Sequence, residues 1–365
     1  PVMALTVAWF AFALAALWRN RRPAAVPVTR REAWIAGGLV ALFTWLAFIA
    51  EPLRAKVLND EFVLQSTAFN LHFFREASTM VRGYAVDGVF LSLDNYIDKR
   101  PILYPFLVSV VHDLTGYRVL NAMFVNVALY PVTLALAWWL ARRFAGVRAG
   151  LLAVALLGGL PLLAQNATGA GMELGNVALL LGTVALAIVY LERPEPPALA
   201  ALVLALVLLG QARYESASFV VVGGIVILLG WWRAGRPVLA WAAVAAPLLL
   251  VPFALRHKVL ANTPVLWELT EERTTRFSLE YVPENLRRAL DFFFSRDLGL
   301  ANSWYLSVLG LVAAAWLVVR LGRERRRRLR DWPPAALAAA PFAAGILVNL
   351  GLVMAYYWAG LNDPM

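Results

Sequence analysis

The sequence contains no cysteine, only three histidines and few charged residues. The lack of cysteine excludes disulfide bonds, thiolate metal sites and cysteine nucleophiles. The three histidines are far apart, so a site with several histidine ligands would have to be assembled by the fold. Charged residues make up 15% of the 365 residues and apolar residues 61%. Soluble globular proteins have about 25% and about 45–50%, so the composition favours a bundle of membrane helices.

We attribute the net charge of +10 to the topology of the chain in a membrane rather than to a nucleic acid partner. A basic soluble protein would suggest a nucleic acid partner, but here the basic residues lie between apolar runs. The 14 Trp, 19 Phe and 11 Tyr suit a protein with two membrane interfaces, where amphipathic rings settle. The sequence therefore predicts a lipid bilayer, and no nucleic acid, as a partner.

Ten apolar segments are long enough, or nearly so, to cross a bilayer, which takes about 20 residues per helix. They are residues 2–18, 33–50, 119–140, 149–163, 174–191, 198–210, 217–232, 238–255, 305–319 and 334–356. The segment 198–210 is short and could be re-entrant. We predict an all-α integral membrane protein with about ten transmembrane helices, forming one domain over 1–365. Because the chain begins at Pro1 and ends soon after an apolar run, we expect a longer protein at both ends.

The distribution of Lys and Arg predicts the orientation in the membrane. If the loop 19–31 is cytoplasmic, so are the loops 142–148, 192–197, 232–236 and 320–331. These loops hold more than half of the 33 Lys and Arg. The two long connections, 51–118 and 256–303, are then extracytoplasmic. The high use of Ala and Arg favours a prokaryotic protein, and hence its inner (plasma) membrane.

Both long connections show helical spacing of apolar residues. The first has Phe62, Phe69 and Phe73, and the second, over 283–298, has Leu286, Leu290 and Phe293. We expect amphipathic helices that lie on the membrane surface. Packing against the bundle is the alternative for both.

Asp60 and Glu61 follow the second apolar segment directly outside the membrane. A partly desolvated carboxylate in this place can act as a general base or a metal ligand. Acidic residues also favour the first turn of a helix, where they are simply solvated. The pair alone does not distinguish these readings.

Asp98, Lys99 and Arg100 precede Pro101 and a further apolar run. Two adjacent cations at a membrane interface can hold a lipid phosphate, and Arg can bind it with a fork of two hydrogen bonds. The alternative is that both cations only extend their charged ends to the interface. Pro101 suits the first turn of a helix.

The order of these features resembles the first extracytoplasmic loop of GT-C-fold glycosyltransferases. The likeness is greatest to the protein O-mannosyltransferase and lipid A aminoarabinose transferase branch. It covers residues 58–118: adjacent acids after an early helix, a surface helix ending near Gly83, an acid–Lys motif before a proline, and then residues 112–118 leading into a span.

The resemblance implies a polyprenyl-phosphate-linked sugar as donor and transfer at the extracytoplasmic face. It makes Asp60, with Glu61 beside it, the catalytic acid pair, and assigns Asp98 and Lys99 to the acid–Lys motif. Arg100 stands where the family pattern has a further proline, so either Lys99 or Arg100 could meet the phosphate.

Four more residues are candidates on the same side of the membrane. The resemblance makes Glu173, at the start of a span, a second active-site carboxylate; a solvated helix terminus is the alternative. Arg213 faces the donor phosphate or else pairs structurally with Glu215. Arg256 and Lys258 form either a phosphate clamp or an ordinary interfacial cluster.

These predictions combine into an inverting glycosyltransferase. Asp60 would take the proton from an acceptor hydroxyl on a lipid, glycan or protein, and the cations would stabilise the departing phosphate. Asp60 with Glu61, Asp98 or Glu173 could instead hold a divalent cation, Mg²⁺ or Mn²⁺. A multi-span transporter or a lipid-carrier flippase is the alternative function.

Overall fold

The computed structural model describes residues 1–20, 27–56, 58–260, 275–297, 299–324 and 328–357. Its long helices are α1 (Val2–Arg19), α2 (Arg30–Ala50), α5 (Asn121–Ala145), α8 (Glu173–Glu192), α10 (Ser218–Ala234), α11 (Trp241–Leu255), α13 (Trp304–Glu324) and α14 (Pro334–Met354). The shorter ones are α3 (Leu58–Phe73), α4 (Leu103–Thr115), α6 (Val147–Gly158), α7 (Pro161–Thr168), α9 (Pro196–Gly210) and α12 (Val282–Phe294). Strands β1 (Thr79–Val86) and β2 (Val89–Tyr96) form an antiparallel hairpin.

Within these described residues, eight helices are long and apolar enough to cross a membrane. A ninth span results if α6 and α7 count as one, although they are bent by 66°. The break falls where Gly158 and Gly159 precede Pro161, which cannot continue the hydrogen-bond ladder of α6. All ten predicted segments are helical over most of their length, so the helical membrane fold is confirmed, and the predicted span 149–163 is two helices.

Helix α9 is the centre of the bundle rather than a re-entrant segment. Residues 198–210 of this helix are all buried, among α1, α8, α10 and α11. Helix α9 begins close to the end of α8 and ends beside the start of α8. There Ser216, which follows α9, donates from Oγ to Oδ1 of Asn176 in α8 over 2.6 Å. With protein on every side, α9 can be apolar all round although it has only 15 residues.

The first long connection differs from the predicted surface helix. Helix α3 ends at Phe73, and Gly83 lies in β1, so the expected helix end near Gly83 is wrong. Residues 79–96 are rich in apolar and β-branched side chains, and Asp87-Gly88 makes the turn with φ of 49° and 78°. Two positive φ values are the requirement of a type I′ hairpin turn. Helix α4 starts at Leu103, two residues after Pro101.

The second long connection contains the predicted amphipathic helix as α12, although residues 261–274 lie outside the described residues. Its apolar stripe of Leu286, Leu290 and Phe293 is about half exposed. Within α12 only Asn285 is buried, and its Nδ2 donates to the carbonyls of Met354, the last residue of α14, and of Tyr356. The exposed stripe favours a helix on the membrane surface over one packed on the bundle.

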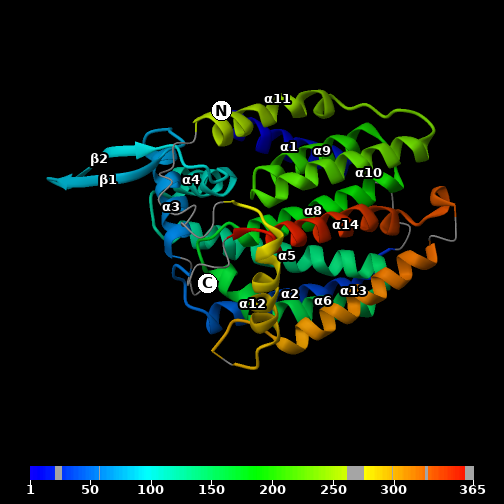
Figure 1. Cartoon of the computed structure of the whole chain (residues 1–365). Helices are drawn as coiled ribbons and strands as arrows, with labels where there is room; N and C mark the ends of the chain where they lie inside the picture. The colour runs from blue at the N-terminus through cyan, green and yellow to red at the C-terminus, as the bar shows by residue number, and fades with distance from the viewer. Residues whose placement is uncertain (21–26, 57, 261–274, 298, 325–327, 358–365) are drawn as a thin grey trace.

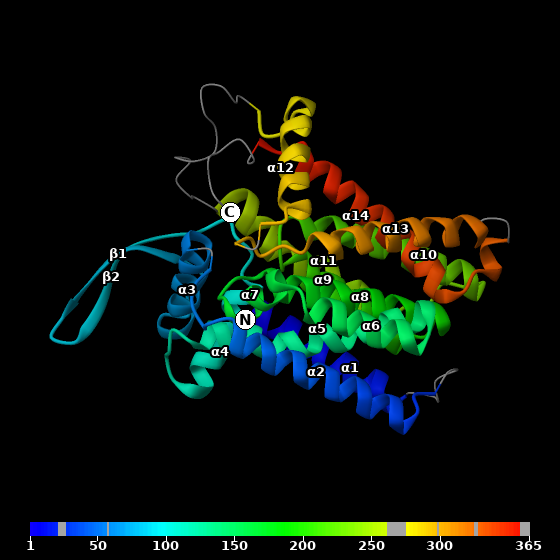
Figure 2. The ribbon, with the colours of Figure 1, turned by 90° about the horizontal axis from the view of Figure 1, so that it is seen from below.

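The connections between the helices lie at two opposite ends of the bundle. Figure 1 shows the long helices lying side by side, with α3, α4 and the hairpin beyond one end of them, which we call the site end. The turns before α8 and after α9 lie at the same end, as does the end of α11. Figure 2 shows the hairpin projecting outward from that end. The loops that are predicted to be cytoplasmic lie at the opposite end.

Candidate active site

Every candidate residue of the sequence lies at the site end, although they come from five separate parts of the chain. Asp60 and Glu61 are in the first turn of α3, and Asp98 to Arg100 connect β2 with α4. Glu173 begins α8, and Arg213 lies between α9 and the short helix η1 (Glu215–Ala217). Arg256 and Lys258 lie in η2 (Arg256–Leu260), directly after α11.

Arg100 bridges two carboxylates. Its Nη2 and Nε donate to Asp60 Oδ1 over 2.5 and 3.2 Å. Its Nη1 donates to Asp98 Oδ2 over 3.0 Å, and its backbone N–H to Asp98 Oδ1 over 2.7 Å. Burial would lower the pKa of Arg100, but the charges of Asp98 and Asp60 raise it above its ordinary value. The guanidinium is therefore a fixed positive charge at this place.

The two acids differ in exposure. Asp98 is fully buried, whereas 40% of the Asp60 side chain is exposed. A buried carboxylate held by a backbone N–H and a guanidinium serves to fix the cation. Asp60 is the member of the cluster that a molecule arriving from outside could reach.

Two tyrosines complete this cluster, and sequence analysis did not find them. Burial, followed by the charge of Asp98, raises the pKa of both Tyr96 and Tyr214. Tyr214 also lies within electrostatic reach of Arg100 and Asp60. Tyrosine side chains are neutral, so a search for charged residues does not find them. Tyr214 is also more than 100 residues from these acids in the sequence. Its place beside Arg213 was the one available clue.

Glu61 points away from Asp60 and into the protein. It is buried, and its two oxygens accept from the backbone N–H of Lys56 over 2.6 Å and of Ala170 over 2.8 Å. Asn126, in α5, holds the same turn by donating to the carbonyls of Gly169 and Gly171 over 2.9 and 2.8 Å. Sequence analysis missed Asn126, although an amide within an apolar span suggests such a role.

Glu173 and Arg213 form an ion pair with a separation of 3.0 Å, and Arg213 also meets Glu215 at 3.3 Å. The expected Arg213–Glu215 pairing is therefore present, together with a second partner. All three side chains are about one-third exposed. A Cβ on Gly171 would overlap Glu173 and would also lie near Glu61, so a glycine here allows both carboxylates to come close to one turn.

Arg256 and Lys258 lie in different surroundings and do not form one cluster. Arg256 is buried and donates to the carbonyl of Ala77, before β1, and it lies within electrostatic reach of Asp98 and Tyr214. Its Nε makes no hydrogen bond within the described part of the chain. Lys258 is exposed, and Lys99 is half-buried.

Each of these carboxylates binds an arginine or backbone N–H groups instead of facing another carboxylate. Asp60 and Asp98 share Arg100, Glu61 binds two backbone N–H groups, and Glu173 pairs with Arg213. Among the described residues there is no group of three or more His, Cys, Asp or Glu that could hold a metal ion.

The structure is similar to the crystal structure of ArnT from Cupriavidus metallidurans bound to undecaprenyl phosphate, with a TM-score of 0.55 and 16% sequence identity. ArnT is a GT-C glycosyltransferase and a lipid A aminoarabinose transferase. The chain has a GT-C-like fold. The likeness covers 89% of the chain and 56% of ArnT, so the chain spans little more than half the length of that protein. No family model matches the sequence, and no curated protein matches it.

The GT-C-like fold confirms the resemblance that the sequence predicted, and with it an integral membrane protein. The fold also explains why the candidate residues lie together. Alternating helices return the chain to the site end after every second span, so each connection there can contribute one or two polar groups. A site of this kind is assembled from several short motifs rather than from one.

Proposed function

We propose that this chain carries the active site of a glycosyltransferase that moves a sugar from a polyprenyl-phosphate carrier to an acceptor hydroxyl, with inversion at the anomeric carbon. The observation that carries the proposal is the Asp60–Arg100–Asp98 bridge at the site end of a GT-C-like fold. The ArnT structure with undecaprenyl phosphate supports a lipid-phosphate donor. We place the reaction at the extracytoplasmic face of a prokaryotic inner membrane.

Arg100 is the first contact for the donor phosphate in this mechanism. A phosphate has the same planar, bidentate match to a guanidinium as a carboxylate has. The donor therefore competes with Asp60 for Nη2 and Nε of Arg100, while buried Asp98 keeps the side chain in place. Once Asp60 has lost this partner, its carboxylate is available to an acceptor.

The transfer step then requires only one protein base, Asp60. The acceptor hydroxyl gives its proton to Asp60 as its oxygen forms a bond to the anomeric carbon. The bond between that carbon and the phosphate oxygen breaks, and its electron pair leaves with the polyprenyl phosphate. Arg100 stabilises the negative charge that grows on the phosphate.

The other candidates have supporting roles in this proposal. Arg213 and Arg256 supply further positive charge around the phosphate, and Lys99 and Lys258 do so from more exposed positions. Glu173 orients Arg213 through their ion pair. Glu61 is a positioning residue, because its hydrogen bonds fix the start of α3 and hence Asp60.

The test is a transfer assay on the purified protein and its Asp60→Asn variant. Both would receive a panel of radiolabelled polyprenyl-phosphate sugars with membrane lipid, glycan and protein acceptors. Loss of a general base lowers turnover by roughly 10²- to 10⁴-fold, so we expect release of label from the carrier with the wild type and almost none with the variant. Asp94→Asn is the matched control, since Asp94 also pairs with an arginine, Arg82, but in the exposed hairpin.

Three outcomes are informative. Equal turnover by wild type and Asp60→Asn would remove Asp60 as the base and retain the enzyme. No cleavage of any donor by a well-folded wild type would argue against a transferase. Movement of an uncleaved donor across the bilayer would then indicate the alternative, a flippase or transporter.

A further inference from the structure

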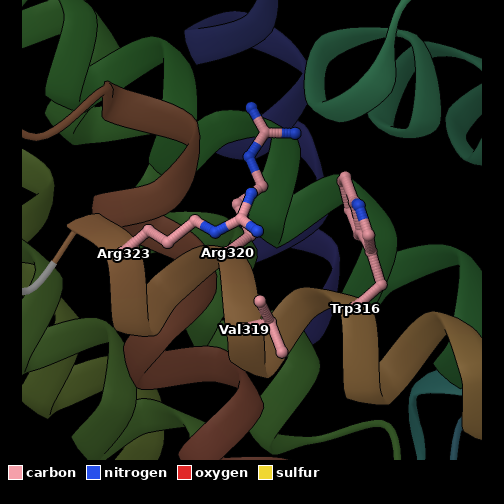
Figure 3. A pocket seen from close by; sticks show the side chains of 4 residues that line it. All are labelled: Trp316, Val319, Arg320 and Arg323. Carbon is pink, nitrogen blue, oxygen red and sulfur yellow. The ribbon is translucent and has the colours of Figure 1, made fainter.

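A second group of cations lies at the opposite end of the molecule, on α13. Trp316, Val319, Arg320 and Arg323 line a hollow of about 340 Å³ there. Their spacing of three or four residues places them on one face of the helix. Figure 3 shows Trp316 and both arginines reaching to the same side of the α13 ribbon.

Arg320 fixes the geometry of this hollow. Its Nη1 donates to the carbonyl of Phe144, in the last turn of α5, which leaves other N–H groups of the guanidinium for a ligand. Its Cζ also lies 5.1 Å from the centre of the Trp316 ring. The side chain is half-buried. Among the described residues, the groups that hold Arg320 in place are therefore uncharged.

Two other arginines at this end have acidic partners. Arg142 pairs with Glu32, and Arg143 pairs with Glu192. Within the part of the chain that the structure describes, no carboxylate pairs with Arg320 or Arg323. Two guanidinium groups that share one hollow without a carboxylate repel each other, and an anion between them would remove this repulsion.

The surroundings of α13 identify the kind of anion. None of its spanning segment is buried, and among the described elements it mainly contacts α12 and α14. Acyl chains of a lipid can therefore lie along the exposed Val319 and Val318. A tryptophan with two arginines at the end of a span lies at the level of the lipid head groups. The charge distribution predicts that this end faces the cytoplasmic leaflet, which is the anionic one.

We propose that this face of α13 binds the phosphate of an anionic phospholipid, at the membrane surface opposite the candidate active site. Arg320 and Arg323 hold the head group, and the lipid connects α13 with the end of α5. The site takes a structural lipid and does not depend on the sugar-transfer proposal.

The test is a lipid titration of the delipidated protein in detergent. Phosphatidylglycerol and phosphatidylcholine with the same acyl chains would be added in parallel, with inorganic phosphate as a third arm. The readouts are the thermal unfolding midpoint and the number of lipids retained in native mass spectrometry. We expect phosphatidylglycerol to raise the midpoint and to be retained, and the other two to have little effect.

Arg323→Gln is the deciding variant, because Arg320→Gln also removes the contact with α5 and could lower stability by itself. Loss of one cation near a head group should weaken phosphatidylglycerol binding by roughly fivefold. Arg330→Gln is the control, since Arg330 is exposed at the same end but lies outside the hollow.

The proposal is overturned by any of three results. Equal stabilisation by phosphatidylcholine would show that acyl chains alone bind. An equal effect of inorganic phosphate would indicate a site for a soluble anion. Equal weakening by Arg323→Gln and Arg330→Gln would show that the charge of this end acts as a whole.

Discussion

At the scale of single residues, the site depends on a guanidinium that meets two carboxylates at once. Arg100 uses Nη2 and Nε for Asp60 and Nη1 for Asp98. A lysine carries the same charge but presents it as a point, without the planar fork. The geometry of Arg100, and not only its charge, is therefore part of the proposed phosphate site.

Arg100→Lys should keep the charge and lose the fork. A hydrogen bond to a charged group is worth about 1.5–3 kcal/mol, so kcat/KM for the donor should fall by about tenfold to a hundredfold. Steady-state kinetics with the lipid-linked sugar would measure the change. Arg82→Lys, in the hairpin, is the control and should leave kcat/KM unchanged. Unchanged kinetics in Arg100→Lys would show that charge alone suffices.

His112, in α4, gives the fold a dependence on pH. Burial, followed by the charge of His72, lowers the pKa of His112 to about 4. Its Nδ1 lies 2.9 Å from Asn121 Nδ2, which donates to it, as suits a neutral ring. In the unfolded chain, the imidazole of this histidine has a pKa of about 6.5. The stability that neutral His112 contributes is therefore present above pH 6.5 and is lost as the pH falls toward 4.

Thermal unfolding between pH 7 and pH 4 would measure this effect. The midpoint of the wild type should fall across the window, and His112→Asn, which keeps an acceptor for Asn121, should show a smaller slope. The lowered pKa of Asp113 places its own titration below the window, because the hydrogen bond from Arg75 favours the charged carboxylate. Identical slopes in both proteins would assign the pH dependence to other groups.

At the scale of elements, close helix contacts depend on glycines of α10. A Cβ on Gly223 would overlap the side chain of Leu206 in α9, and a Cβ on Gly230 would overlap Tyr190 in α8. Small residues of this kind let membrane helices approach closely, where packing replaces the hydrophobic effect. The central position of α9 rests on such contacts.

Gly223→Leu should force α9 and α10 apart. Overpacking costs about 1–3 kcal/mol, which should appear as a lower unfolding midpoint and a lower yield of monodisperse protein. Gly224→Leu is a close control, because a Cβ there meets no described atom within 4 Å and the gain in helix propensity is the same. Similar losses in both variants would show that the glycines serve the helix backbone and not the contact.

Residue patterns predict some of these elements well and others poorly. Apolar runs predict the spans because a bilayer core demands them, and the stripe of Leu286, Leu290 and Phe293 predicts α12. The hairpin was missed although Asp87-Gly88 was present, since the family resemblance placed a surface helix as far as Gly83.

The partners of single residues were harder to predict. Glu61 accepts from Ala170, which is 109 residues away, and no local pattern gives such a pairing. The Asp60–Arg100 pair was within reach because both residues belong to motifs of known order. Tyr214 and Asn126 carry no charge, so only their three-dimensional surroundings mark them.

At the scale of the whole molecule, the two ends have different chemistry. The site end has carboxylates that share arginines, with a hairpin projecting from it. At the opposite end, Arg320 and Arg323 line one hollow, and no described carboxylate pairs with them. The prediction that the site end is outside and the basic end in the cytoplasm rests on this distribution of charge.

Single cysteines would test this orientation directly, because residues 1–365 contain none to interfere. Ala85→Cys in the hairpin should react with a membrane-impermeant maleimide in intact bacterial spheroplasts. Arg330→Cys, at the opposite end, should react only after lysis. Both positions are exposed, so access to the reagent and not burial decides the result. The reverse pattern would invert the orientation and place the proposed site in the cytoplasm.

The bridge between Asp60 and Arg100 has a kinetic consequence for the proposed enzyme. While the donor is absent, Arg100 engages Oδ1 of Asp60, so an acceptor that arrives first meets a carboxylate with one of its oxygens already bound. The two substrates should therefore add in a compulsory order, with the lipid-linked sugar first. Water meets the same restriction, which limits wasteful hydrolysis to the interval when the carrier is already bound. A membrane enzyme whose donor is scarce would conserve it in this way.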